Sequence, residues 1–292
     1  MAIRVICVPY DSGHRGRRMG AGPEHLIANG LREDLEAAGL AVSVHSVKAP
    51  SQFLTEIGSA FELHRELSDV VSASVREGLL PLVLSGNCNS SVGTVSGLQA
   101  AGTGGDLGVV WFDGHGDSNT PETFSGTFLD AMGLTTLTGR CWQALCATVP
   151  GYAAIRDERV LLVGGHAADD GALQNLASSG ICHLETRDVL RDFRSALAGP
   201  LDRMAAAGVR TVYVHVDLDV LDARLARANQ FAREAGLSPD LLWGCIDLVL
   251  ARFPASATAI ASYDPSFDEG GRVLSTARRI AQAVGKTSDS RP

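Results

Sequence analysis

Residues 107–123 read LGVVWFDGHGDSNTPET, an uninterrupted apolar run that ends abruptly in polar residues. A run this short and continuous is typical of a strand that is buried on both faces of a parallel sheet. Similar runs recur along the chain, over 3–8, 79–84, 159–164, 209–216 and 258–263. The sequence therefore predicts a sheet assembled from strands that are distant from one another along the chain.

Segments with apolar residues at helical spacing separate these runs. We expect helices over about 26–38, 53–71, 187–207, 238–252 and 271–285, and Ser238 followed by Pro239 is a typical helix start. Repeated strand–helix alternation with right-handed crossovers predicts an α/β fold, a three-layer αβα sandwich around a single, mainly parallel sheet of about eight strands. No change of composition divides the chain, so we expect a single domain over 1–292.

The composition excludes several classes of protein. The 292 residues hold 25 Lys and Arg against 33 Asp and Glu, a net charge of −8, which argues against a nucleic-acid partner. The first residues lack the apolar core of a signal peptide, and no apolar run is long enough to cross a membrane, so we expect no membrane partner. Six cysteines without CxxC spacing form neither a disulfide framework nor a zinc ribbon, and they favour the reducing cytoplasm.

Polar residues directly after two of the predicted strands carry the candidate chemistry. Asp113, His115 and Asp117 follow one strand, and alternate residues of an extended segment point to the same side. Asp217 and Asp219 follow a second strand in the same way. Each cluster alone also fits a capped or solvated turn, but carboxylates this close repel one another unless cations lie between them. Together the clusters predict two divalent ions, and oxygen donors with one imidazole suit Mn²⁺.

A third polar cluster, SGNCNSSVG over 85–93, follows the apolar run at 79–84. Its glycines favour a tight turn from strand to helix that places Cys88 at the same edge of the sheet. A thiol in this position is either a small buried hydrophobe or a metal ligand, and the segment by itself favours the former. His215 has the parity of Asp217 but lies deeper in its strand, so we expect it to pack rather than to bind metal.

Five segments, in this order, resemble motifs of the arginase–agmatinase–formiminoglutamase family of dinuclear manganese hydrolases. They are GAGPEHLIANGL (20–31), SGNC (85–88), DGHGDSNTPET (113–123), HVDLDVLD (215–222) and SYDPSFD (262–268). The DxHxD block with its NTPET tail is the most specific of these, and the resemblance covers nearly the whole chain. It implies an arginase-like fold, two divalent ions, most often Mn²⁺, and a homo-oligomer, either a trimer or a hexamer.

Ligand roles for individual residues come from that resemblance. The implied ligands are Asp117 and Cys88 for one ion, His115 and Asp219 for the other, and Asp113 and Asp217 as bridges between both. Cys88 stands where the family has a histidine. A thiolate is a softer ligand than imidazole, so it would shift the preference of its site from Mn²⁺ toward Zn²⁺ or Fe²⁺.

The resemblance also implies hydrolysis at a guanidinium carbon, in which Asp117 orients an attacking hydroxide shared by the two ions. Asp130 stands at the position of a proton-shuttling histidine, and a carboxyl could replace that histidine only with a raised pKa. Asn119 and Asp169 match the residues that contact the α-carboxylate and the α-amino group of an amino-acid substrate. Ser262 stands where arginases have a glutamate that faces the guanidinium.

We therefore expect a metal-dependent amidinohydrolase that releases urea from a guanidino amino acid such as arginine. One alternative is an N-hydroxy-arginine amidinohydrolase of a biosynthetic pathway, because a hydroxyguanidine is less basic and suits a pocket without that glutamate. Another is a catalytically degenerate binding or scaffold protein, which the changes at positions 88, 130 and 262 would allow. A nucleotide-binding α/β protein is disfavoured, because no GxGxxG or Walker pattern follows a strand.

Overall fold

The computed structural model describes residues 2–49, 55–124, 126 and 128–287. Eight strands form one sheet in the order β4-β1-β5-β10-β9-β6-β7-β8, and every neighbouring pair is parallel. The strands are β1 (Ala2–Val8), β4 (Ala41–Ser46), β5 (Leu80–Ser85), β6 (Leu107–Asp113), β7 (Val160–Gly164), β8 (Cys182–Glu185), β9 (Thr211–Asp217) and β10 (Ala255–Ala261). A small antiparallel pair, β2 (Tyr10–Asp11) and β3 (His14–Arg15), lies outside this sheet.

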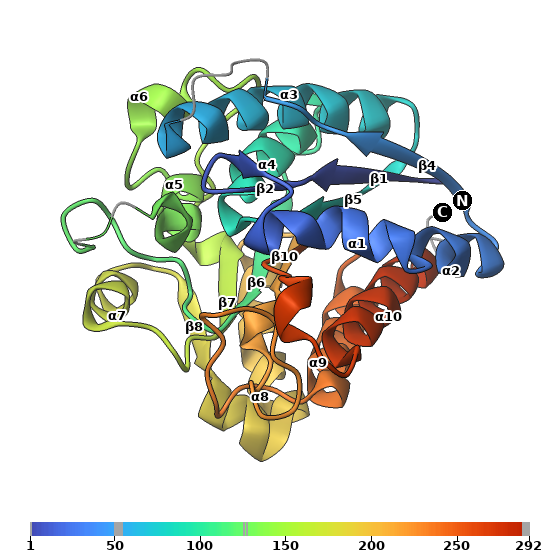
Figure 1. Cartoon of the computed structure of the whole chain (residues 1–292). Helices are drawn as coiled ribbons and strands as arrows, with labels where there is room; N and C mark the ends of the chain where they lie inside the picture. Colours follow the sequence, from blue (N-terminus) through green and yellow to red (C-terminus); the bar gives the residue numbers. More distant parts are fainter. Residues whose placement is uncertain (1, 50–54, 125, 127, 288–292) are drawn as a thin grey trace.

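Helices cover both faces of the sheet (Figure 1), which confirms the predicted three-layer α/β fold. One face carries α1 (Gly22–Ala28), α2 (Leu31–Ala37), α8 (Thr186–Ala206), α9 (Pro239–Arg252) and α10 (Arg272–Thr287). The other carries α3 (Glu56–Arg76), α4 (Ser91–Ala100), α5 (Gly133–Leu137) and α7 (Asp170–Ala177), and the short α6 (Gln143–Cys146) packs against α3 and α4.

The two helical layers explain why the strands are apolar without alternation. In β6, Val110 and Phe112 pack in the core of the α8–α9–α10 layer, whereas Val109 and Trp111 pack in the core of the α3–α4 layer. Both faces of each central strand are therefore removed from water, and burying them stabilises the fold by roughly 25 cal/mol for each Å² of apolar surface.

Two edge strands, β4 and β8, are absent from the predicted set. The side chains of β4 are mostly exposed or half-buried, and β8 has only one fully buried residue, Leu184. An edge strand covered on one side alone needs no continuous apolar run, so its sequence gives a weak signal. The central strands lie within a few residues of their predicted bounds.

The predicted helix over 26–38 is wrong as a single element, because the chain forms α1 and α2 with a break between them. Gly30 has φ = 92°, a left-handed conformation that interrupts a helix and that glycine adopts without steric cost. The predicted start of α9 is confirmed, since the Ser238 hydroxyl accepts a hydrogen bond from the Leu241 N–H at 3.2 Å. Phe53, predicted at the start of the second helix, lies outside the described residues.

The described helices include none with both the length and the apolar character that a membrane crossing needs.

Gly164, the last residue of β7, packs closely against the backbone of Asp113, a candidate metal ligand. It pairs with Asp113 in the β6–β7 ladder at φ = 131°, and a Cβ there would overlap the backbone oxygen of Asp113. We predict that Gly164→Ala lowers the free energy of unfolding by at least about 2 kcal/mol, measured by urea denaturation.

Gly105→Ala is the matched control, because Gly105 lies exposed in the turn before β6 and an added Cβ meets no atom within 4 Å beyond its chain neighbours. Alanine restricts the unfolded chain more than glycine does, so this variant is expected to be neutral or more stable by up to about 1 kcal/mol. Equal stabilities for the two variants would contradict the packing argument at Gly164.

Candidate metal centre

Four neighbouring strands end at one edge of the sheet, and each brings a polar side chain there. β6 ends in Asp113 and β9 in Asp217, Ser262 follows β10, and Cys88 begins the 3₁₀ helix η2 (Cys88–Ser90) after β5. Because these strands are parallel neighbours in the order β5-β10-β9-β6, their carboxyl ends meet. The site therefore depends on a sheet order that joins distant parts of the chain.

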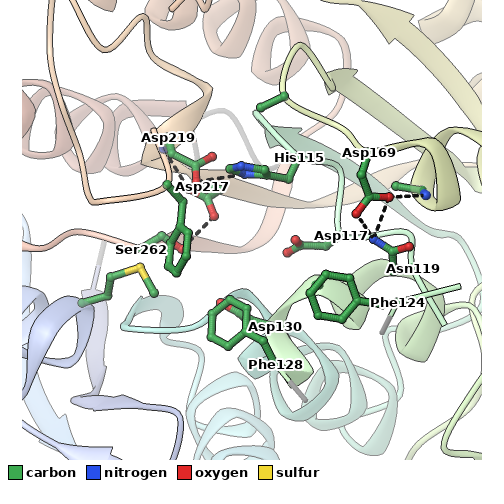
Figure 2. Close-up of a pocket in the computed structure, with 15 residues that line it drawn as sticks. His115, Asp117, Asn119, Phe124, Phe128, Asp130, Asp169, Asp217, Asp219 and Ser262 are labelled. Carbon is green, nitrogen blue, oxygen red and sulfur yellow. Dashed lines mark hydrogen bonds and ion pairs between the residues drawn. The ribbon is translucent and has the colours of Figure 1, made fainter. Parts of the chain in front are cut away.

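The possible metal donors fall into two groups. Cys88, Asp113, Asp117 and Asp217 form one group, and Asp113, His115 and Asp219 form the other. Within each group the donor atoms lie within 4.8 Å of one another, and Asp113 belongs to both. The structure thus brings together all six residues that the sequence predicts as ligands. Of the two predicted bridges, Asp113 belongs to both groups and Asp217 to the first group alone. Figure 2 shows the side chains of His115, Asp117, Asp217 and Asp219 directed toward one cavity.

The segment after β6 does not reach this arrangement in the extended form that the alternating spacing predicts. Gly116 has φ = 82° and Asp117 has φ = 43°, so the chain turns sharply. The cause is Asp113, whose Oδ1 accepts hydrogen bonds from the N–H groups of His115 at 2.5 Å and Gly116 at 2.8 Å. The side chains converge because of this turn and not because of strand parity.

Burial and mutual repulsion dominate the electrostatics of the centre. Burial raises the pKa values of Asp113, Asp117 and Asp217, and the charges of neighbouring aspartates raise them further. Burial lowers the pKa of His115, but its ion pair with Asp219, with Nδ1 and Oδ2 at 3.2 Å, outweighs this effect and raises the pKa to about 9. The imidazole is the only cationic partner among the residues of the two groups.

These residues fit a pair of divalent cations. Asp117 Oδ2 is buried and has no hydrogen-bond partner, which leaves an unsatisfied acceptor directed into the site. Carboxylate, imidazole and thiolate are the donors that Mn²⁺, Fe²⁺ and Zn²⁺ take in proteins. Positive ions would also relieve the repulsion among the buried carboxylates.

Cys88 lies inside the first group and not merely in a tight turn. Its Sγ donates to Asp217 Oδ2 at 2.8 Å and lies 3.3 Å from the hydroxyl of Ser262, which donates to the same carboxylate oxygen at 2.7 Å. Burial, followed by the charge of Asp217, raises the pKa of Cys88 well above its ordinary value. A thiolate at this position therefore requires a cation beside it.

Ser262 reaches Asp217 from an uncommon backbone conformation, with φ = 63°. Such a conformation costs a residue other than glycine roughly 1–3 kcal/mol and persists where the surroundings hold it in place. The hydrogen bond to Asp217 and the burial of Ser262 are such constraints.

Trp111 and His215 support the centre from beneath. The indole N–H of Trp111 donates to Asp113 Oδ2 at 2.8 Å, and its ring stacks on His215 with centroids 3.7 Å apart. His215 Nδ1 lies 2.9 Å from the Tyr213 hydroxyl, and among the described residues His215 belongs to neither donor group. The sequence marks Trp111 only as part of an apolar strand, although a buried indole N–H generally needs an acceptor.

Asp130 lines the same cavity, where two asparagines that the sequence does not single out hold its carboxylate. It accepts from Asn87 Nδ2 at 2.9 Å and from the Asn89 N–H at 2.8 Å. Burial raises the pKa of Asp130 to about 7, although these hydrogen bonds act in the opposite direction. The raised pKa that a proton-transferring carboxyl needs is present.

Asn119 and Asp169 lie at the end of the cavity away from Ser262 (Figure 2) and contact each other. Asn119 Nδ2 donates to the two carboxylate oxygens of Asp169 at 3.0 and 3.2 Å, and Asn119 Oδ1 accepts from the Thr123 hydroxyl at 3.0 Å. Asp169 also caps α7 by accepting from the Ala172 N–H at 2.8 Å. The cavity between this pair and the donor groups measures ≈ 150 Å³.

Asp222 ends the acidic run after β9 but belongs to neither donor group within the described chain. Its carboxylate is paired with the guanidinium of Arg224 and accepts from the Ala235 N–H at 3.1 Å. It stabilises a loop and is not available to an ion in the cavity.

The fold and the two donor groups define an α/β protein with a candidate dinuclear metal centre. The arginase family profile matches residues 1–286, and the chain belongs to the arginase family, whose members are metal-dependent ureohydrolases. The arginase of Bacillus caldovelox is 29% identical over 231 residues, covering 75% of each chain, and that of Bacillus subtilis is 28% identical over 230 residues, covering 75% of this chain and 76% of its own. The crystal structure of Bacillus cereus arginase superposes with a TM-score of 0.87 at 24% identity, covering 98% of this chain and 99% of its own.

We predict that Asp113→Asn weakens the binding of both ions, because Asp113 is the carboxylate common to both donor groups. The loss is expected to exceed the roughly 10–100-fold effect of removing an outer partner of a ligand. Titration calorimetry of chelator-treated protein with Mn²⁺ or Zn²⁺ measures this, and circular dichroism verifies the fold.

Asp222→Asn removes a buried carboxylate from the same sheet edge and is the matched control. It is expected to keep the wild-type stoichiometry, since Arg224 already occupies that carboxylate. Wild-type affinity in Asp113→Asn would contradict the assignment of this residue as a shared ligand.

Proposed function

We propose that this protein hydrolyses a C–N bond of a guanidino amino acid and releases urea. The observation that carries the proposal is the pair of donor groups that share Asp113, because four of their members, His115, Asp117, Asp217 and Asp219, line one cavity. Membership of the arginase family supports the same chemistry. The cavity has room for a small molecule, and its carboxylates suit a cationic guanidinium.

We propose Cys88, Asp113, Asp117 and Asp217 as ligands of one ion and Asp113, His115, Asp217 and Asp219 as ligands of the other. We propose Mn²⁺ for both sites, with Zn²⁺ or Fe²⁺ favoured at the first site if Cys88 binds as a thiolate. When bound, such ions lower the pKa of a water molecule so that it is a nucleophile at neutral pH.

The remaining steps fall to side chains of the chain itself. Asp117, whose Oδ2 has no partner, accepts a hydrogen bond from the attacking water and directs its oxygen toward the guanidinium carbon. As the C–N bond breaks, the leaving amine takes up a proton, and we assign its donation to Asp130. Asn87 and Asn89 hold the Asp130 carboxyl at the cavity wall for this transfer.

Asn119 and Asp169 are the proposed contacts for the amino-acid end of the substrate. The carboxylate of Asp169 suits the α-amino group, and Asn119 fixes the orientation of that carboxylate. Ser262 offers a hydroxyl and no charge to the guanidino end of the cavity. A less basic N-hydroxyguanidine therefore belongs in any substrate test.

We further propose that the protein acts in the cytoplasm, a location supported by six cysteines that are all unpaired. A trimer or hexamer is proposed from the resemblance to the family, and the size of the purified protein in solution tests it.

Protein loaded with Mn²⁺ is expected to release urea from arginine or N-hydroxy-arginine in a panel that also contains agmatine and a formimino compound. In titration calorimetry of the chelator-treated protein, Cys88→His is expected to bind Mn²⁺ more tightly than the wild type, because imidazole is the harder ligand.

Asp130→Asn is expected to retain its ions but to lose about 100-fold in kcat for urea release, the usual effect of removing a general acid.

Absorption of the Co²⁺-loaded protein provides a readout that does not depend on turnover. A thiolate ligand gives a sulfur-to-cobalt charge-transfer band, which Cys88→His should abolish. Unchanged metal content and spectrum in that variant would exclude Cys88 as a ligand. No urea from any member of the panel would refute the proposed function, and less than one ion per chain would favour the scaffold alternative.

A further inference from the structure

A chain of hydrogen bonds joins the buried Asp130 to the surface of the protein. Asp130 lines the cavity (Figure 2), and its Oδ2 accepts from Asn87 Nδ2 at 2.9 Å. The other end of the same amide, Asn87 Oδ1, accepts from the Ser12 N–H at 2.9 Å. The Ser12 hydroxyl donates to Asp11 Oδ1 at 2.9 Å, and Asp11 forms an ion pair with Arg18. The chain of contacts therefore ends at a side chain that is half exposed to solvent.

The Ser12 N–H decides which end of the Asn87 amide faces Asp130. A side-chain amide has an acceptor at one end and donors at the other, and the two ends have nearly the same shape. Because a backbone N–H can only donate, it holds the amide oxygen toward Ser12 and leaves the NH₂ group directed at the Asp130 carboxyl. If that contact were lost, the amide could turn over and place its oxygen against the carboxyl, acceptor against acceptor.

Glu56, at the start of α3, holds the same region from a second direction. Its Oε1 accepts from the N–H of Leu129, the residue before Asp130, at 3.0 Å. Glu56, Ser12 and Asn87 all line one small cavity of ≈ 20 Å³. The backbone and the side chain of Asp130 are therefore held by groups that meet beside Ser12.

The segment over 10–18, which contains β2 and β3, has an uncommon backbone conformation. Ser12 has φ = 47° and Arg18 has φ = 48°, values that residues other than glycine rarely adopt. Gly86, in the turn after β5, packs so closely on this segment that a Cβ there would overlap the backbone oxygen of Tyr10. A strained conformation of this kind persists only where the surroundings hold it in place, and such strain is common at functional sites.

The ion pair between Asp11 and Arg18 closes this segment. Asp11 is 1% exposed, and its two carboxylate oxygens contact the Arg18 guanidinium at 3.0 and 3.2 Å. A buried carboxylate depends on such a partner, because removal of one member leaves the other without compensation. Loss of either member is therefore expected to release the segment, and with it the Ser12 N–H that orients Asn87.

We infer that Asp11 and Arg18, which do not line the cavity, are positioning residues for proton transfer by Asp130. The inference rests on the proposed function, in which the carboxyl of Asp130 gives its proton to the leaving amine. It assigns the conformation of the segment over 10–18 a role in turnover, because the hydrogen bonds of this segment lead to Asp130.

Asp11→Asn keeps the size of the side chain but places an NH₂ group against the Arg18 guanidinium. The assay uses the Mn²⁺-loaded protein and the panel compound that the wild type hydrolyses fastest. We expect kcat for urea release to fall about 10-fold, which is part of the loss of about 100-fold expected of Asp130→Asn. KM and the number of bound ions are expected to stay at their wild-type values, which a general loss of structure would not allow.

Arg18→Gln and Arg18→Lys test the charge at a position where folding is not at risk, since the Arg18 side chain is 47% exposed. The glutamine removes the charge and is expected to lower kcat several-fold. The lysine keeps the charge but not the paired geometry, and it is expected to restore most of the activity. Equal kcat values for these two variants would contradict a role for the ion pair.

Asp34→Asn is the matched control, because both oxygens of Asp34 also contact a single arginine, Arg278, between α2 and α10. Neither residue lines the cavity. Urea denaturation is expected to show a loss of stability, whereas kcat should stay at the wild-type value. If Asp34→Asn lost as much kcat as Asp11→Asn, reduced stability would explain both results and the inference would be overturned.

Crystal structures of the two asparagine variants provide an arm that does not require turnover. In Asp11→Asn, Asn87 Nδ2 and Asp130 Oδ2 are expected to lie more than about 3.5 Å apart, beyond hydrogen-bond range. In Asp34→Asn the wild-type distance of 2.9 Å is expected. Either a wild-type kcat or an unchanged distance in Asp11→Asn would overturn the inference and leave the proposed function intact. Absence of urea from every panel compound would refute the proposed function, and the distance alone would then decide whether the ion pair orients Asn87.

Discussion

Repulsion among carboxylates buried at one edge of the sheet is the constraint on which the rest of the structure depends. Asp113, Asp117 and Asp217 lie within a few ångströms of one another and out of water. Two like charges 4 Å apart repel by about 4 kcal/mol at an effective dielectric constant of 20. Backbone N–H groups and the Trp111 indole reduce this repulsion without cancelling it. The sheet order holds these carboxylates together, and bound cations would relieve their repulsion.

The central part of the fold can be predicted from the sequence because both faces of its strands are buried. In β6, neighbouring residues pack into opposite cores, and this produces the continuous apolar run over 107–112. The same logic fails at the edges, where β4 needs no such run, and at Gly30, where one left-handed residue divides a helical pattern into two helices. Periodicity reports average burial and is insensitive to a single backbone dihedral.

The metal donors can also be predicted, because charged residues directly after buried strands must find partners. The residues that hold those donors cannot. Trp111 contacts Asp113 from within an apolar strand, and Asn229 joins Phe231 to the end of β10 across a long loop. Their roles depend on sheet order and loop closure, which bring together segments with no shared pattern. The cavity lining has the same origin, since Phe124 and Phe128 come from the segment between β6 and α5 and Phe231 from the segment between β9 and α9.

The most direct test of two ions at this sheet edge is anomalous diffraction from crystals of the protein grown with Mn²⁺, recorded on both sides of the manganese absorption edge. Two anomalous peaks per chain are predicted, one among Cys88, Asp113, Asp117 and Asp217 and the other beside His115 and Asp219. A single peak, peaks elsewhere in the molecule, or no peak at saturating Mn²⁺ would contradict a dinuclear centre built from these residues.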